Sequence, residues 1–304
     1  MNELTLSNNS LITESIAQQW FDFLDVKPKT LETYAKALKQ FVLFLNGNDK
    51  PQRQDVINFR ESIRTTHKPT TCQTYLMAVK QFFKWLSSIG AYPNIAENVK
   101  GIKIDKGFKK DYLTSNQAKS VLENIDRTTL SGKRDYAIIL LMLTTGLRTV
   151  EVQRANIEDL RNVADFTALF IQGKGREDKE EFVKVAPSVE KAINEYLNAR
   201  GVYRDSEPLF GSVANRNSGE RMTTRSISRL VKNSLIDADL NRERLTAHSL
   251  RHTTATLNLM NGGTLEETKQ LLRHSNINTT LIYAHSLERA NNNSENRIES
   301  VLFN

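Results

Sequence analysis

Cysteine is almost absent from this sequence, because Cys72 is the single cysteine among 304 residues. One cysteine cannot form a disulfide within the chain, and it cannot supply the thiolate cluster of a structural metal site. The sequence therefore indicates a protein of a reducing compartment, and we expect it in the cytoplasm.

Long apolar runs are missing as well. The longest, "YAIILLMLTTGL" at 136–147, is well short of the roughly 20 residues that a membrane-spanning helix needs, and it predicts a buried core helix. The first residues, "MNELTLSNNS", do not join a basic start to an apolar run, so we expect no secretory signal. Internal repeats and low-complexity segments are also missing.

Acidic residues are fewer than basic ones, 35 against 42, which gives a formal net charge of +7. This balance favours polyanionic partners, nucleic acid first. The hydrophobic fraction of 39% is ordinary for a globular protein, and 304 residues suffice for two cores. We expect a helical domain over 10–92, a linker over 93–110, a second domain over 111–290 and a C-terminal tail over 291–304.

Four stretches of the first hundred residues have the apolar spacing of helices: 10–24, 30–47, 55–66 and 70–90. Thr30 is the expected N-cap of the second helix, while Gly47 and Gly90 are expected to end the second and the fourth. The lysine-rich segment that follows has no clean period, and it predicts an extended basic linker.

The rest of the chain mixes helices with one short hairpin. Helices are expected behind a capping box of Thr114 and Gln117, over 134–145, from Pro187 and over 223–236. Two alternating stretches, 167–173 and 180–186, predict antiparallel strands joined by "KGREDK". The whole pattern predicts a mainly α protein with a small β-hairpin or sheet, of the α+β class.

Basic residues gather on three of these helices. Charges on a helix are most often a solvated face, but repeated clusters in a basic protein also suit DNA phosphates. The residues that we expect to face DNA are Lys36, Lys39, Lys80, Lys84, Arg225, Arg229 and Lys232.

The stretch "LTAHSLRHTTATL", residues 245–257, places His248, Arg251 and His252 on one face of a helix, since residues three and four apart share a face. One interpretation is a partly buried polar patch. A second is a zinc site of the two histidines, which the permanent charge of Arg251 between them opposes. In the third, Arg251 binds an oxyanion while His248 moves a proton.

Four segments favour the oxyanion. "TTGLRTVE", "IQGKGREDK", "HSLRH" and "LLRHSNINTTLIYAH" resemble, in order and spacing, the four sequence boxes of the tyrosine site-specific recombinases, which include phage integrases and Xer recombinases. The resemblance covers about 110–290 and implies a two-domain architecture, with a helical core-binding domain before a catalytic domain. It implies six catalytic residues: Arg148, Lys174, His248, Arg251, His274 and Tyr283.

The chemistry of strand cleavage explains these residue types. Tyr283 supplies a phenolic nucleophile that can hold the phosphate covalently and later leave. Arg148 and Arg251 can grip the non-bridging oxygens in fork geometry. Lys174 is the expected acid for the departing 5′ hydroxyl, and His248 can accept the tyrosine proton. As in the family, the expected link is a 3′-phosphotyrosine, formed without a metal or any other cofactor.

Neighbouring positions have supporting assignments. His274 can hydrogen-bond the phosphate, Glu151 is expected to orient the active-site arginine, and His252 is expected to pack the helix. Arg273 stands where the family usually has glycine, which would ease a left-handed helix end. Arg273 therefore either strains that turn or adds a phosphate contact.

Three other functions share some of these features. A type IB topoisomerase has a site of this style but relaxes DNA, and the small helical N-terminal domain favours a recombinase. A DNA-binding regulator without strand exchange would not need Tyr283. A metal nuclease needs clustered carboxylates, and the sequence suggests no such cluster.

The resemblance also implies partners. They are double-stranded DNA with inverted-repeat sites and further protomers, in a homo-tetramer or a hetero-tetramer with a paralogue, at the nucleoid. The tail carries four apolar residues after an asparagine-rich hinge: Ile298, Val301, Leu302 and Phe303. We expect this cluster to dock, either on its own catalytic domain or, as is the habit of the family, on a neighbouring protomer. An additional N-terminal arm-binding domain is not expected, which favours a Xer-like or small mobile-element recombinase.

Overall fold

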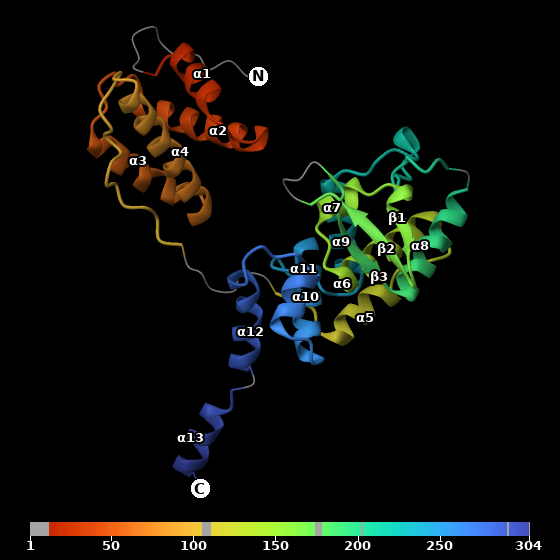
Figure 1. Ribbon diagram of the computed structural model, residues 1–304. Coiled ribbons are helices and arrows are strands. Elements are labelled where there is room, and N and C mark those ends of the chain that lie inside the picture. Colours follow the sequence, from red (N-terminus) through yellow and green to blue (C-terminus); the bar gives the residue numbers. More distant parts are fainter. Residues whose placement is uncertain (1–11, 105–110, 174–177, 202, 291, 304) are drawn as a thin grey trace. The chain divides into compact units, whose positions relative to one another are not determined.

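In the computed structural model the chain divides into two compact units, Met1–Gly107 and Phe108–Asn304 (Figure 1). The structure describes residues 12–104, 111–173, 178–201, 203–290 and 292–303, and for 285–290 the backbone alone. Each unit has its own hydrophobic core, so each is described by itself.

Helices with an aromatic core form the first unit. They are α1 (Glu14–Phe23), α2 (Pro28–Leu45), α3 (Arg53–Thr66) and α4 (Pro69–Ser88). The Phe41 ring meets Phe59 and Phe83 edge-on, with ring centroids 5.0 Å and 5.8 Å away. Such pairs add roughly 0.5–1.5 kcal/mol each to the stabilisation from buried area. The four helices predicted from apolar spacing are confirmed.

Two details of this unit differ from the prediction. The helix α2 begins at Pro28 and not behind a Thr30 cap, because proline at the first helical position needs no partner for an N–H. The segment expected as an extended linker from residue 93 is at first part of the core, where Ala96 and Val99 are only 1% and 2% exposed. The apolar residues that precede its first lysine, Lys100, therefore decide where the start of this segment lies.

The second unit is mainly helical and contains a small sheet (Figure 1). Its elements, in chain order, are α5 (Ser115–Glu123), α6 (Leu130–Thr145), α7 (Thr149–Arg154), η1 (Ile157–Asp159), β1 (Leu160–Val163), β2 (Phe166–Ile171), β3 (Glu181–Val185), α8 (Pro187–Arg200), η2 (Asn215–Asn217), α9 (Thr224–Asp237), α10 (Ala247–Met260), α11 (Leu265–Leu272), α12 (Asn278–Ala290) and α13 (Ser294–Phe303). The expected mainly α fold with a small β element is confirmed.

The sheet is antiparallel, with the strand order β1-β2-β3. Strands β2 and β3 form the predicted hairpin, in which Thr167 lies opposite Val185. Strand β1 was not predicted; it pairs Leu160 with Leu169 at the edge of the hairpin. Its four residues, two of them exposed, are too few to display a two-residue period.

The helix α6 lies at the centre of this unit's core and packs against α8 and α10. Ile138, Ile139 and Leu141 are fully buried, which is why apolar residues surround this helix instead of following one stripe. It begins at Leu130 behind a Thr129 cap, earlier than the predicted residue 134. The capping box of Thr114 and Gln117 at α5, by contrast, is present as predicted.

The end of the chain leaves apolar side chains in contact with solvent. On α13, Ile298 is 61% exposed, Val301 82%, Leu302 70% and Phe303 82%. Within the ranges that the structure describes, no helix is both long enough and apolar enough to cross a membrane.

Candidate active site

Side chains from separate parts of the second unit line one cavity of about 290 Å³. Five of the six predicted catalytic residues lie on its wall: Arg148, His248, Arg251, His274 and Tyr283. Arg148 precedes α7, and His248 and Arg251 lie on α10. His274 follows α11, and Tyr283 lies on α12. The sixth, Lys174, is outside the described residues. The fold thus brings together residues from three of the four sequence boxes.

Arg251 is a buried cation anchored to two helix ends. Its side chain is 1% exposed, Nη1 donates to the Gly146 carbonyl at 2.5 Å, and Nη2 donates to the Leu272 carbonyl. These carbonyls lie at the ends of α6 and α11, where backbone acceptors lack helical partners and carry partial negative charge. Burial, and next the charges of Arg148 and Arg273, lower the pKa of Arg251 to about 9, so the guanidinium stays charged at neutral pH.

The "TTGLR" stretch turns sharply at Gly146. Its φ of +63° is left-handed, and a Cβ at this position would lie 2.6 Å from Cδ2 of Leu272. Glycine satisfies both the conformation and the close approach. The turn lets the end of α11 reach Arg251 and places Arg148 at the N-cap of α7.

Arg148 is held by Glu151, in the supporting arrangement expected. The Glu151 side chain is 1% exposed; Oε1 accepts from Nη1 of Arg148 at 2.8 Å, and Oε2 accepts from the Arg148 backbone N–H at 2.8 Å. Burial by itself would raise the pKa of the Glu151 carboxyl, but the Arg273 charge and the Arg148 hydrogen bonds outweigh it, so this pKa is lowered. The carboxylate thus fixes both the backbone and the guanidinium of Arg148.

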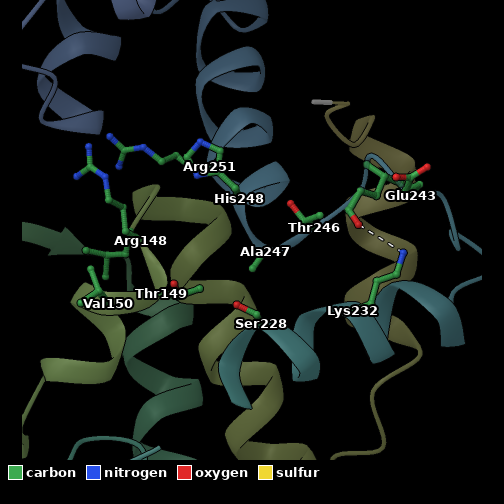
Figure 2. A pocket seen from close by; sticks show the side chains of 12 residues that line it. Arg148, Thr149, Val150, Ser228, Lys232, Glu243, Thr246, Ala247, His248 and Arg251 are labelled. Atoms are coloured by element: carbon green, nitrogen blue, oxygen red, sulfur yellow. Dashed lines mark hydrogen bonds between the residues drawn. The ribbon is translucent and has the colours of Figure 1, made fainter. Parts of the chain in front are cut away.

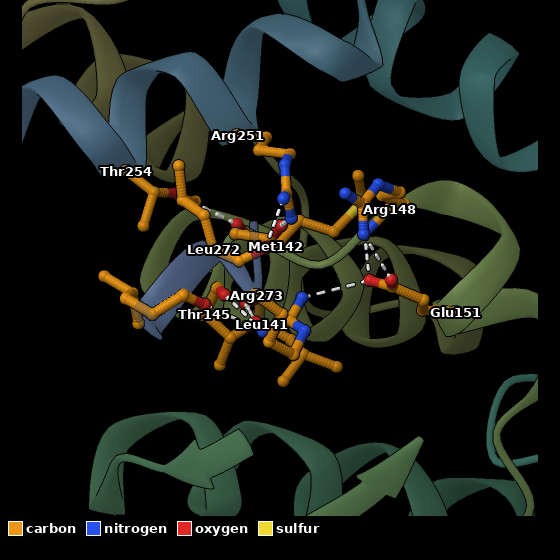
Figure 3. Close-up of polar contacts among 11 residues, drawn as sticks. Leu141, Met142, Thr145, Arg148, Glu151, Arg251, Thr254, Leu272 and Arg273 are labelled. Atoms are coloured by element: carbon orange, nitrogen blue, oxygen red, sulfur yellow. Dashed lines mark hydrogen bonds and ion pairs between the residues drawn. The ribbon is translucent and has the colours of Figure 1, made fainter. Parts of the chain in front are cut away.

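Arg273 has the left-handed conformation expected at this turn, with φ 54° and ψ 48°. The Arg273 backbone N–H donates to the Gln270 carbonyl, and the His274 backbone N–H donates to the Lys269 carbonyl, both at 3.0 Å. This pair of hydrogen bonds ends α11 as a Schellman motif. Figure 3 shows the guanidinium directed at Glu151, and Nη2 lies 3.0 Å from Oε2. Arg273 is therefore engaged by a carboxylate of the protein itself.

The ring of His274 is oriented by Thr280, a residue that the sequence did not single out. Nδ1 lies 2.9 Å from Oγ1 of Thr280, which is fully buried. Burial, and next the charges of Arg251 and Arg148, lower the pKa of His274 to about 4. If the hydroxyl donates to Nδ1, the neutral imidazole carries its hydrogen on Nε2 and can donate it to a phosphate oxygen.

Three rings lie in sequence from Tyr283 to His248. The His252 ring centroid is 5.2 Å from that of Tyr283 and 4.7 Å from that of His248. Tyr283 is 4% exposed. Burial raises the pKa of its phenol, while the charges of Arg251 and Arg148 act in the opposite sense. The nucleophile predicted from the sequence is thus a protonated phenol at neutral pH, and it needs a base before it can attack.

A second cavity, of about 620 Å³, shares Arg148, His248 and Arg251 with the first (Figure 2). Lys232 and Glu243 also line it. The Lys232 ammonium donates to the carbonyls of Arg242 at 2.9 Å and Leu245 at 3.5 Å. Lys232 therefore holds the segment that leads into α10.

The other basic residues expected to face DNA lie on α2, α4 and α9. Those with exposed side chains are Lys36, Lys84, Arg225 and Arg229. Lys39 is partly exposed. Lys80 differs, because its ammonium donates to the Val99 carbonyl at 2.7 Å. Lys80 and Lys232 thus have backbone partners that the sequence did not reveal.

The charges of the first cavity favour an anionic ligand. Within the described part of the chain, no group of three or more His, Cys, Asp or Glu side chains is placed to hold a metal ion. The guanidiniums of Arg148 and Arg251, the neutral imidazole of His274 and the phenol of Tyr283 can together bind a phosphodiester, stabilise charge on its oxygens and attack its phosphorus.

Comparison with known proteins agrees with this chemistry. Residues 111–289 match the phage integrase family, and residues 17–90 match the N-terminal SAM-like domain of phage integrases. A tyrosine recombinase of Synechocystis sp. is 30% identical over 273 residues, which are 84% of this chain and 86% of that protein. The tyrosine recombinase XerC of Thermodesulfovibrio yellowstonii is 31% identical over 268 residues, which are 84% of this chain and 85% of that protein.

Two solved structures share the fold. XerH recombinase, bound to its palindromic difH substrate, has a TM-score of 0.71 at 24% identity and covers 86% of this chain and 78% of that one. A lambda integrase dimer bound to a core site has a TM-score of 0.71 at 14% identity, and the match covers 90% of this chain and 78% of that one. The match to the phage integrase family spans more than half of the chain, from 111 to 289. This chain therefore belongs to the phage integrase family, the tyrosine recombinases, which cut and rejoin DNA strands by transesterification.

Proposed function

We propose that this protein exchanges DNA strands at specific sites through a covalent bond between Tyr283 and a 3′ phosphate. The observation that carries this proposal is the convergence of Arg148, Arg251, His274 and Tyr283 on one cavity. The arginines supply fixed positive charge, His274 supplies a neutral donor, and Tyr283 supplies the attacking oxygen.

Two steps make up the proposed reaction. In the first, Oη of Tyr283 bonds to phosphorus, the phenolic proton passes to His248, and the P–O5′ bond breaks. Lys174 gives a proton to the departing 5′ oxygen. In the second, a 5′ hydroxyl of the partner strand gives its proton to Lys174 and attacks the phosphotyrosine, and the Tyr283 oxygen leaves and takes a proton back from His248. One phosphodiester is lost and one is formed, so we expect neither ATP nor a metal or another cofactor to be needed.

The proposed role of the arginines depends on their being held in place before DNA binds. Arg251 is bound to the carbonyls of Gly146 and Leu272, and Arg148 is bound to Glu151. Donors fixed in this way need little reorganisation when charge develops on the phosphate oxygens, which is how preorganised sites lower a barrier.

Two of the alternative functions, the topoisomerase and the DNA-binding regulator, are not favoured. A type IB topoisomerase would share the cavity, but the N-terminal helical unit is of the phage integrase kind. A DNA-binding regulator would have no use for a tyrosine positioned beside a phosphate-binding pair of arginines.

The proposed partners are duplex DNA with inverted repeats and three further protomers. Support comes from XerH, which was solved on a palindromic substrate, and from lambda integrase, which was solved as a tetramer on a Holliday junction. We assign 10–92 to the core-binding domain, 93–110 to the connection, 111–290 to the catalytic domain and 291–304 to docking on a neighbour. A substrate of this kind suits a cytoplasmic, nucleoid-associated protein.

A nicked suicide duplex tests the proposal. The wild-type protein is expected to form a covalent adduct that survives on a denaturing gel, whereas Tyr283→Phe is expected to bind the duplex and form none. Tyr136→Phe, outside the cavity, serves as the matched control and should form the adduct normally. An adduct with Tyr283→Phe would exclude Tyr283 as the nucleophile.

A further inference from the structure

We propose that Arg273 is a positioning residue for catalysis, which acts through Glu151 on Arg148 and keeps the charge of Arg148 available to the scissile phosphate. This inference rests on the proposed function, because Arg148 is assigned there to the phosphate. It gives a role to the arginine that stands where the family usually has glycine.

The contacts at Glu151 carry the inference. Its carboxylate accepts from three donors: the Arg148 guanidinium at 2.8 Å, the Arg148 backbone N–H at 2.8 Å and the Arg273 guanidinium at 3.0 Å (Figure 3). The Arg273 side chain is 9% exposed and that of Glu151 is 1% exposed, so water competes little for these bonds. The position of the carboxylate, and with it that of Arg148, therefore depends on Arg273.

Charge gives a second reason. A buried Glu151 paired with Arg148 alone would form a neutral pair, and its carboxylate would repel a phosphate that approaches Arg148. The positive charge of Arg273 on the same carboxylate offsets that repulsion. Arg148, Glu151 and Arg273 together carry one net positive charge, whereas Arg148 and Glu151 alone would carry none.

The backbone conformation gives a third. A left-handed residue with a Cβ is unfavourable, and glycine would end α11 without that cost. Arg273 retains this conformation while its Nη1 donates to the carbonyls of Leu271 at 2.8 Å and Thr145 at 3.4 Å. These carbonyls are next in sequence to the Gly146 and Leu272 carbonyls that Arg251 binds. Arg251 directly, and Arg148 through Glu151 and Arg273, therefore depend on the ends of α6 and α11.

Adduct formation at saturating protein tests the inference. Arg273→Gly should fold, because glycine favours this turn, and should bind the duplex about as well as the wild type. Its first-order rate of adduct formation should fall by about tenfold or more, since small displacements of a reacting geometry cost rates of this order. Arg273→Lys should recover part of the rate, because it restores the charge without the planar fork. The matched control is Lys269→Gln, which removes a cation of α11 that pairs with Glu266 instead, and it should react at about the wild-type rate.

Two further measurements separate positioning from a general structural effect. In a protein that already carries Glu151→Gln, Arg273→Gly should lower the rate of adduct formation by less than about twofold. The reason is that Arg273 acts on Arg148 through Glu151, so that the two effects are not independent. In the free protein, the Nε–H signal of Arg148 in an NMR spectrum should be sharp for the wild type and broadened for Arg273→Gly.

The outcomes are distinct. A wild-type rate for Arg273→Gly, fully multiplicative effects in the double variant, or an unchanged Arg148 signal would each overturn the positioning role. An Arg148 signal that changes as expected, in a protein that forms no Tyr283-dependent adduct, would support the positioning role and overturn the proposed function.

Discussion

At the scale of single residues, burial lowers the pKa of two cavity side chains but leaves them with different charges at neutral pH. It lowers the pKa of Arg251 to about 9 and that of His274 to about 4. At neutral pH the guanidinium is therefore charged and the imidazole neutral. A bound phosphate would therefore contact a charged guanidinium and an uncharged imidazole donor. The positive charges of Arg251 and Arg148 help to keep the imidazole neutral, because they lower the pKa of His274.

This difference predicts a pH dependence of stability. The unfolded chain has a histidine pKa of about 6.5, whereas the folded value for His274 is about 4. Between these values the unfolded state binds more protons, so the free energy of unfolding should fall as the pH decreases from about 6.5 to 4. Urea unfolding at several pH values measures this slope, and His274→Gln should make it shallower.

NMR titration of the free protein gives an independent check, with His274→Gln used to assign the resonance. The His274 ring should show no midpoint between about pH 5.5 and 8, given its pKa of about 4. A midpoint near 6.5, or an unfolding slope that His274→Gln leaves unaltered, would contradict the account of a neutral imidazole.

At the scale of elements, the hairpin of β2 and β3 is tied to the protein on both sides of the segment that carries Lys174. The Arg154 guanidinium donates to the Gly173 carbonyl at 3.4 Å. The Lys179 ammonium pairs with Asp159, which is 2% exposed and also accepts from the Asn156 backbone N–H at 2.6 Å. These contacts fix Gly173 and Lys179, which flank the segment that carries Lys174 in sequence.

We therefore predict that Lys179→Met slows strand cleavage through the acid step. The rate of adduct formation on an ordinary phosphodiester should fall by about tenfold, within the range that general acid catalysis supplies. A substrate with a bridging 5′ sulfur, which leaves without a proton, should be affected much less. Lys174→Ala provides the full effect for comparison, and Lys119→Met on the exposed face of α5 is the control. Equal losses on both substrates would mean that Lys179 does not act through the acid.

The basic stripe of α9 divides into two kinds of residue. Arg225 and Arg229 are exposed, whereas the Lys232 ammonium is bound to backbone carbonyls. The double variant Arg225→Ala with Arg229→Ala should flatten the plot of log affinity against log salt by up to about two units, since each lost phosphate contact removes roughly 0.9. Lys232→Ala should leave that slope unchanged and instead lower the free energy of unfolding by roughly 0.5–1.5 kcal/mol. A flatter slope for Lys232→Ala would support the prediction that Lys232 contacts DNA.

At the scale of the whole molecule, the exposed apolar residues of α13 bear on assembly. Val301 and Phe303 are each 82% exposed, and none of the residues of α13 is buried. Burial of such side chains stabilises by roughly 1.5–3 kcal/mol each, so they favour a partner surface. This arrangement supports the proposal that the tail docks on a neighbouring protomer.

Deletion of 293–304 tests the docking proposal. The truncated protein should remain folded and bind a single site, because the core of the catalytic unit lies outside this segment. Cooperative filling of paired sites and complete strand exchange should be lost, as measured by gel shift and by a recombination assay. Glu299→Gln, a change at an exposed polar position of α13, is the control. Normal pairing by the truncated protein would refute docking in trans, and loss of folding would indicate docking in cis.

The sequence by itself determined most of the helices and five residues that line the cavity. The apolar stripe of α9 and the capping box of α5 are local signals, since spacing along the chain reports which face is buried and where a helix begins. The proposed catalytic set could be predicted because each box is a short contiguous motif. The domain boundaries and the roles of the six residues are still predictions of this kind.

Only the tertiary structure decided which groups meet. The Gly146 turn fits against Leu272, and Thr280 orients His274. Arg273 pairs with Glu151, although these two residues are far apart in sequence. The internal partners of Lys80 and Lys232 were likewise hidden. The physical reason is that periodicity shows that a side chain is buried but not what it is buried against. Hydrogen bonds and ion pairs form between whichever groups the packing of distant helices brings within about 3 Å.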